Sequence, residues 1–172
     1  MNEIVAALTQ CYALACEGAW QLLLDAASDA LVLIRKRSAS RNLEPDFLAH
    51  VAAAQIELGN PAAGRAAAAE SVGIMRETQY AWTVHSYAVL ARAQFALREP
   101  AADIAATLDE YAALLERTAF HLHAGELYEL RARLAEREGH AADRIAALQS
   151  AHDCYTSFGM TNQAARIAAA IG

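Results

Sequence analysis

A short pattern recurs along this chain at a spacing of about 40 residues, and this internal repeat constrains the fold more than any other feature. Residues 55–63 align with 94–102 at an offset of 39, and the Gln, Leu and Pro-Ala-Ala positions coincide. Residues 100–103 then align with 140–143 at an offset of 40, and 15–19 is a weaker candidate for the first copy. A period of this length is typical of one supersecondary unit stacked several times.

The apolar positions in each copy recur every three or four residues, which is the helical period rather than the strand period. About a quarter of the residues are alanine, with only 8 glycines and 3 prolines, a composition that favours an all-α fold. We expect one domain over 1–172, with hairpins at 3–37, 45–77, 80–117 and 120–157 and a capping helix at 161–170. The expected hairpin helices are 3–17, 20–37, 45–58, 61–77, 80–98, 101–117, 120–138 and 141–157.

Small residues and turns indicate how each hairpin packs. Pro61 and Pro100 suit the first helical position, where a missing amide hydrogen does little harm. The alanines at 52–54 are expected to face those at 66–69, which would bring the two helix axes close together. Each hairpin then leaves an apolar face that only the next hairpin can cover, so we expect a stack.

Units of 34 to 40 residues with a Gly or Pro turn and small residues at the helix crossing resemble tetratricopeptide repeats. The usual Trp-Leu-Gly-Tyr core positions are not matched. In the second copy they hold Leu48, Val51, Ala52 and Gln55, and in the third copy Tyr87, Leu90, Ala91 and Gln94. The resemblance implies an α-α superhelix whose concave groove, lined by the first helix of each pair, binds a protein or peptide.

Two segments near the C-terminus carry a narrower resemblance. Similarity to the C-terminal helical-repeat regions of bacterial multidomain regulators is carried by residues 116–120, 126–134 and 138–140 in the first segment and by 155–159 and 164–166 in the second. Those regulators carry class III adenylate cyclase domains, or an ATPase module with a helix-turn-helix domain. The resemblance implies a binding or regulatory role associated with such a regulator, and it transfers no catalytic residue.

Mapping the repeat turns onto the groove gives the candidate binding residues. They are His85, Arg92 and Phe95 in the third copy and Tyr128 and Arg131 in the fourth, with Asp46, Ala49, Ala53 and Ile56 in the second. An arginine can hold a carboxylate by a two-pronged contact, and an aromatic ring can stack on a peptide. In the alternative interpretation, Arg92 only pairs with Glu99 and Glu126, and His85 is a solvated or packed histidine.

Catalytic motifs are missing, so we expect a protein that is not an enzyme and holds no cofactor. The single lysine, Lys36, lies in no phosphate-binding loop, and no HExxH or GxSxG run occurs. His121 and His123 are two residues apart, point to different sides of a helix and lack a third ligand, so no metal site is predicted. The three cysteines are interpreted as small buried residues in a reducing compartment.

The formal net charge of −6 argues against direct nucleic-acid binding. The basic cluster at Arg35, Lys36, Arg37 and Arg41 is interpreted as a helix C-terminus that balances the helix dipole. There is no basic start of a signal peptide and no apolar run of about 18 residues, so we expect a cytoplasmic protein without a membrane segment.

Three functional hypotheses follow. The leading one is a protein- or peptide-binding scaffold or regulatory module. The first alternative is a domain that senses a small-molecule effector in a pocket near Phe95 and Tyr128. The second alternative is a self-association module, because uncovered apolar faces at the ends of a stack favour a homodimer.

Overall fold

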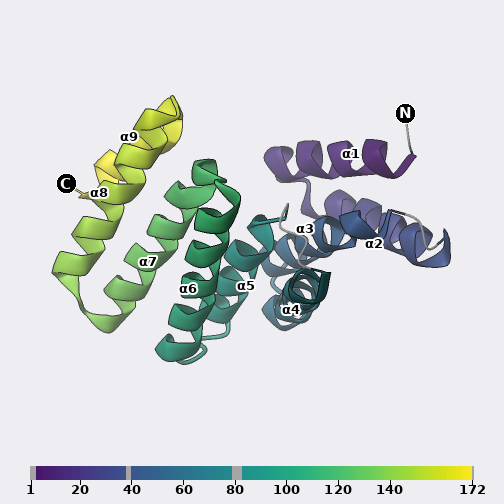
Figure 1. Cartoon of the computed structure of the whole chain (residues 1–172), viewed down its shortest axis with the longest axis horizontal. Helices are drawn as coiled ribbons and strands as arrows, with labels where there is room; N and C mark the ends of the chain where they lie inside the picture. Colours follow the sequence, from purple (N-terminus) through teal and green to yellow (C-terminus); the bar gives the residue numbers. More distant parts are fainter. Residues whose placement is uncertain (1–2, 38–39, 79–82, 172) are drawn as a thin grey trace. The chain divides into compact units, whose positions relative to one another are not determined.

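The computed structural model describes residues 3–37, 40–78 and 83–171, and these residues form α-helices joined by short turns, without a strand (Figure 1). The α-helices are α1 (Glu3–Glu17), α2 (Trp20–Arg37), α3 (Glu44–Glu57), α4 (Pro61–Thr78), α5 (His85–Ala96), α6 (Ala101–Thr118), α7 (Ala124–Glu138), α8 (Ala141–Ser157) and α9 (Thr161–Ile171). Two 3₁₀ turns, η1 (Arg41–Leu43) and η2 (His121–His123), precede α3 and α7. The all-α prediction is confirmed.

Two helices start later than the repeat pattern predicts. The helix expected from residue 120 begins at Ala124, because η2 comes first and the amide of His123 donates to the carbonyl of Phe120. The helix expected from residue 80 is observed as α5, from His85 to Ala96, and residues 79–82 lie outside the described part of the chain. Pro61 is the first residue of α4 as predicted, whereas Pro100 is the N-cap of α6.

The chain divides into two compact units, residues 1–98 with α1 to α5 and residues 99–172 with α6 to α9. Three of the expected hairpins, α1–α2, α3–α4 and α7–α8, lie within one unit each. The helices of the remaining hairpin, α5 and α6, belong to different units. The single domain expected over the whole chain therefore stays a prediction, and each unit is described separately below.

In the N-terminal unit, helices that are neighbours in sequence pack together, and α3 lies at the centre, in contact with α1, α2, α4 and α5. Its core includes the fully buried Leu23, Ile34 and Phe47. Helices α3 and α4 pack closely at Gly64, where an added Cβ would lie 2.9 Å from the carbonyl oxygen of Ala52. The sequence placed the contact at the alanines of 66–69; of these, Ala68 is fully buried and Ala66 is exposed.

In the C-terminal unit, α7 and α8 form a tight antiparallel pair and α9 packs on α8 (Figure 1). The core joins Leu148, Ala151 and Tyr155 of α8 to Ala164 and Ile167 of α9. The capping role predicted for the last helix agrees with this packing. Helix α6 also packs on α7 within the same unit.

The turns that end several helices share one backbone geometry. In four of them an amide donates to the carbonyl five residues earlier, and a glycine with positive φ precedes the donor. The pairs are Ala19 to Leu14 after Gly18 at 3.0 Å, and Asn60 to Gln55 after Gly59, His140 to Ala135 after Gly139 and Met160 to Tyr155 after Gly159, each of these three at 2.8 Å. This geometry closes a helix end around a left-handed residue. It gives the repeated turn in the sequence its physical basis.

Candidate functional site

The expected groove residues are divided between the two units. His85, Arg92 and Phe95 lie on α5 in the N-terminal unit, and Tyr128 and Arg131 lie on α7 in the C-terminal unit. In the N-terminal unit, α3 packs against both α1 and α5. These are the first helices of three successive copies of the sequence repeat. We call the surface that they share the first-helix face.

A buried carboxylate lies where α3 and the start of α5 meet. Asp46 is buried and accepts a hydrogen bond of 2.8 Å from the hydroxyl of Thr83. Burial raises the pKa of Asp46, while the Thr83 hydrogen bond and the charge of His85 act in the opposite direction. Asp46 and His85 were both named from the sequence as groove residues. Asp46 is buried, and His85 is partly exposed at the start of α5.

His50, one turn after Asp46 on α3, was not identified from the sequence. It is buried, and its ring meets the edge of Tyr12 from α1 with ring centroids 4.7 Å apart and planes at 85°. Burial, followed by the nearby His85, lowers the pKa of His50 to about 4, so His50 is neutral at pH 7. Tyr12 is half exposed, and it supplies an aromatic surface that the repeat mapping did not predict.

Arg92 forms an ion pair across the first-helix face. Its Nη2 lies 2.5 Å from Oε1 of Glu57 on α3, and both side chains are about one-third exposed. The sequence named Glu99 and Glu126 as pairing partners, but the contact observed in the N-terminal unit is with Glu57. The repeat pattern alone does not indicate Glu57 as the partner of Arg92. That pairing can be inferred only when α3 and α5 are known to lie side by side.

Phe95, Tyr128 and Arg131 are less available than the repeat mapping predicts. Phe95 is buried, so its ring packs in the interior rather than offering a face for stacking. Tyr128 is partly buried and packs against the core of α7, α8 and α9. Arg131 pairs with Asp109 of α6 at 3.1 Å. A ligand contact by any of the three stays a prediction.

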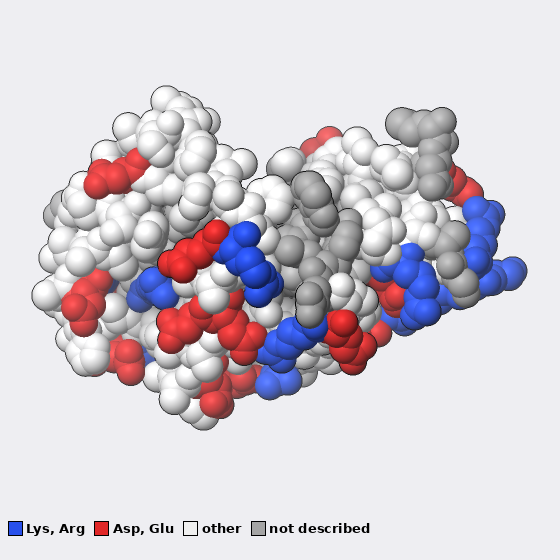
Figure 2. Space-filling model, in the orientation of Figure 1, with Lys and Arg blue, Asp and Glu red and all other residues white. Residues whose placement is uncertain are grey.

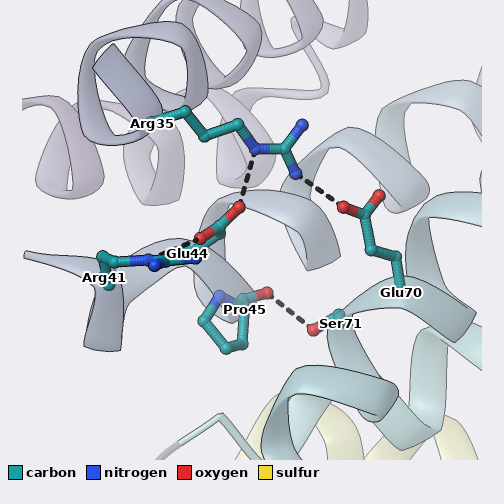
Figure 3. Close-up of polar contacts among 6 residues, drawn as sticks. All are labelled: Arg35, Arg41, Glu44, Pro45, Glu70 and Ser71. Atoms are coloured by element: carbon teal, nitrogen blue, oxygen red, sulfur yellow. Dashed lines mark hydrogen bonds and ion pairs between the residues drawn. The ribbon is translucent and has the colours of Figure 1, made fainter. Parts of the chain in front are cut away.

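A pocket of about 670 Å³ opens between the end of α2, η1, the start of α3 and the second half of α4. Arg35 reaches across it, with Nε 2.7 Å from Oε1 of Glu44 and Nη2 2.6 Å from Oε1 of Glu70 (Figure 3). Nε of Arg41 lies 3.9 Å from the second oxygen of Glu44. We call this the Arg35 pocket.

The Arg35 pocket revises the interpretation of the basic cluster. Arg35, Lys36 and Arg37 do form the last turn of α2, but Arg35 and Arg41 also gather around the buried Glu44. Arg37 pairs with Glu3 at 2.9 Å. The spacing of Arg41 and Glu44, three residues apart, was the available signal. Below Glu44, the hydroxyl of Ser71 donates to the carbonyl of Pro45 at 2.8 Å (Figure 3).

Metal-binding and membrane-spanning features are absent from the described ranges. Within them, no three His, Cys, Asp or Glu side chains gather closely enough to hold a metal ion. None of the helices described combines the length and apolar character needed to cross a bilayer. Of the cysteines, Cys11 is buried and burial raises its pKa to about 11, whereas Cys16 is exposed, so the expectation of uniformly buried cysteines is wrong. On the face drawn in Figure 2, Lys and Arg atoms are interspersed with Asp and Glu atoms.

Comparison with known proteins identifies the fold. No family model and no curated protein matches the chain. Among solved structures, the chain is similar to a thermophilic TPR protein of Thermus thermophilus, with a TM-score of 0.61 and 18% sequence identity. The match covers 98% of this chain and 89% of that protein. The chain therefore has the fold of a tetratricopeptide-repeat protein, built from consecutive helical hairpins.

Proposed function

We propose that the chain is a non-enzymatic scaffold that binds a protein or peptide on the first-helix face. The observation that carries this role is the packing of α3 against both α1 and α5, which are the first helices of three successive copies of the sequence repeat. Side chains that stay at least partly exposed on these helices include Tyr12 of α1, Glu57 of α3 and Arg92 of α5. The proposed segment contacts all three helices.

The side chains on the first-helix face suit a peptide with both apolar and polar groups. The half-exposed ring of Tyr12 offers an aromatic surface over the buried His50. Glu57 and Arg92 supply a carboxylate and a guanidinium that remain partly exposed while paired. Arg92 can turn from Glu57 to a carboxylate of the bound segment, because arginine binds carboxylates in a planar fork.

A second part of the proposal concerns the identity of the partner. The sequence between 116 and 140 and between 155 and 166 contains runs that resemble repeat regions of bacterial regulators with cyclase or ATPase modules. We propose on this basis that the chain belongs to, or associates with, such a signalling or transcription regulator in the cytoplasm. A fused or neighbouring coding sequence for a cyclase, ATPase or DNA-binding domain would support this association.

Site-specific photo-crosslinking tests the binding face. A photoreactive phenylalanine analogue replaces Tyr12 in the full chain, and the matched control carries it at Val32, which is 65% exposed on α2. We expect one discrete partner adduct from position 12 and none from position 32. Equal adducts from both positions, or none from position 12, would contradict the proposed face.

Two variants distinguish a binding role of Arg92 from a structural one. Arg92→Ala removes the cation and should lower the adduct yield. Glu57→Ala releases Arg92 from its carboxylate and should raise the yield, because less competition remains for the partner's carboxylate. If both variants lower the yield equally, the ion pair is structural and Arg92 does not contact the partner.

A further inference from the structure

We propose that the Arg35 pocket binds an organic cation, an alkyl guanidinium or alkyl ammonium group, between Glu70 and Glu77 of α4. This site shares only the start of α3 with the first-helix face, since the rest of its lining comes from the end of α2, η1 and α4. Its volume of about 670 Å³ leaves room for such a group and the chain that carries it.

The two arginines in the pocket are already committed to carboxylates. Arg35 donates to Glu44 and to Glu70, and Arg41 lies near the remaining oxygen of Glu44. Glu44 is buried, with its side chain 6% exposed, so this arrangement compensates a carboxylate that water hardly reaches. The charges of the two arginines are thus matched by the carboxylates of Glu44 and Glu70.

Carboxylate oxygens remain available on the α4 wall. Oε2 of Glu70 and both oxygens of Glu77 have no hydrogen-bond or ion-pair partner among the residues that the structure describes. Two arginines and three glutamates line the pocket, so it carries one uncompensated negative charge. A single cation restores neutrality.

The spacing on α4 suits a cation on an alkyl stem. Glu70, Ile74 and Glu77 are separated by four and three residues, so they lie on one face of the helix. Ile74 lies between the two carboxylates and, with Pro45, supplies apolar wall to the pocket. A methylene chain can pack there while its charged end reaches a glutamate. Arg35 between Glu44 and Glu70 already shows this mode of recognition within the chain (Figure 3).

Isothermal titration of the full chain tests the site with two probes. Agmatine presents a free alkyl guanidinium, and the peptide acetyl-Gly-Arg-Gly-amide presents the same group as a side chain. We expect saturable binding of at least one probe, weakened by salt. Binding of agmatine alone identifies a small-molecule source, and binding of the peptide identifies a partner side chain. Absence of binding by both probes would overturn the proposal.

Three variants test the cation site, because each has a predicted direction of change in affinity. Glu77→Gln should weaken binding about tenfold, since one charged contact is lost. The matched control Glu17→Gln makes the same change at an exposed residue on α1 outside the pocket and should stay within about twofold of the original chain. Arg41→Gln removes a competing cation that is 73% exposed and should tighten binding about threefold. Unchanged binding in Glu77→Gln, or weaker binding in Arg41→Gln, would refute the cation site.

Discussion

The two compact units differ in what they bury. In the N-terminal unit the buried polar side chains are Glu44, Asp46, His50, Ser71, Thr83, Ser86 and Gln94, whereas among the described residues of the C-terminal unit the buried polar side chain is Thr107. In the C-terminal unit, the side-chain hydrogen bonds between helices lie nearer the surface. Glu129 accepts hydrogen bonds from Tyr155 at 2.6 Å and from Arg166 at 2.7 Å, and Glu129 is 24% exposed.

This difference separates two ways of holding helical hairpins together. Burying a polar group is unfavourable unless it is hydrogen-bonded, so the N-terminal unit bears more of this cost than the C-terminal unit, where the hydroxyls of Thr107, Tyr111 and Tyr155 belong to buried residues. In return, its buried contacts tie α4 to α5 through Ser71 and Ser86, 2.7 Å apart, and bring Asp46 to Thr83. Both proposed binding surfaces lie in this unit, beside these contacts.

We expect acid to unfold the N-terminal unit first, and this loss of stability is the largest effect that we predict. Burial lowers the pKa of His50 from 6.5 to about 4. The unfolded chain therefore binds a proton near pH 6.5 and the folded chain only near pH 4, so the free energy of unfolding falls as the pH drops through this window. The loss approaches about 3 kcal/mol. Asp46 offsets part of it, because its raised pKa makes the folded chain bind a proton before the unfolded chain does.

Urea denaturation followed by circular dichroism at several pH values between about 7 and 4 measures this loss. His50→Phe keeps an aromatic ring against Tyr12 and should remove most of the acid sensitivity. The matched control His152→Phe changes a half-exposed histidine of α8 and should leave the sensitivity in place. Equal acid sensitivity in the chain with and without His50 would show that another group is responsible.

In the C-terminal unit, we expect close packing to determine the effect of a glycine-to-alanine substitution on the free energy of unfolding. A Cβ added at Gly125 would overlap Cε1 of Tyr155, whose hydroxyl is held by Glu129. Gly125→Ala should therefore lower the free energy of unfolding by about 2 kcal/mol. Gly73→Ala, at a helical position with no atom within 4 Å, should raise it by about 0.5–1 kcal/mol. Equal shifts for both variants, measured by urea denaturation, would remove the packing explanation.

The smallest expected change in the free energy of unfolding comes from the left-handed residues at helix ends, one in each unit. Ala119 ends α6 with a φ of 56°, while Gly59 takes the left-handed position after α3 with a φ of 84°. Ala119→Gly should raise the free energy of unfolding by about 0.5–1 kcal/mol because glycine adopts this conformation without strain, and Gly59→Ala should lower it by a similar amount. Thermal unfolding that shows a loss in Ala119→Gly would contradict this explanation of the turn.

Much of the fold could be predicted because local signals repeat. Gly59 and Pro61 mark one turn, and their counterparts at 98 and 100 mark the next, so helix ends follow from the spacing alone. The starts of α5 and α7 could not be placed in this way. The 3₁₀ turn before α7 depends on a hydrogen bond between His123 and Phe120, which carries no strong sequence signature.

The candidate sites were less predictable, because they depend on which helices lie side by side. Asp46 and His85 were both named as groove residues, a role that stays a prediction, and His50 was missed because a histidine in an alanine-rich helix looks like a packing residue. The pairing of Arg92 with Glu57 joins residues 35 positions apart. Glu44 was missed because charged residues are seldom buried, and its burial is tolerable only beside Arg35.

Hydrogen exchange measured by mass spectrometry on the full chain, with and without the partner captured at position 12, tests the scaffold role most directly. Binding on the first-helix face should slow exchange in peptides from α1, α3 and α5 and leave α8 and α9 unchanged. Protection confined to α8 and α9, with α1, α3 and α5 exchanging as in the free chain, would contradict that role.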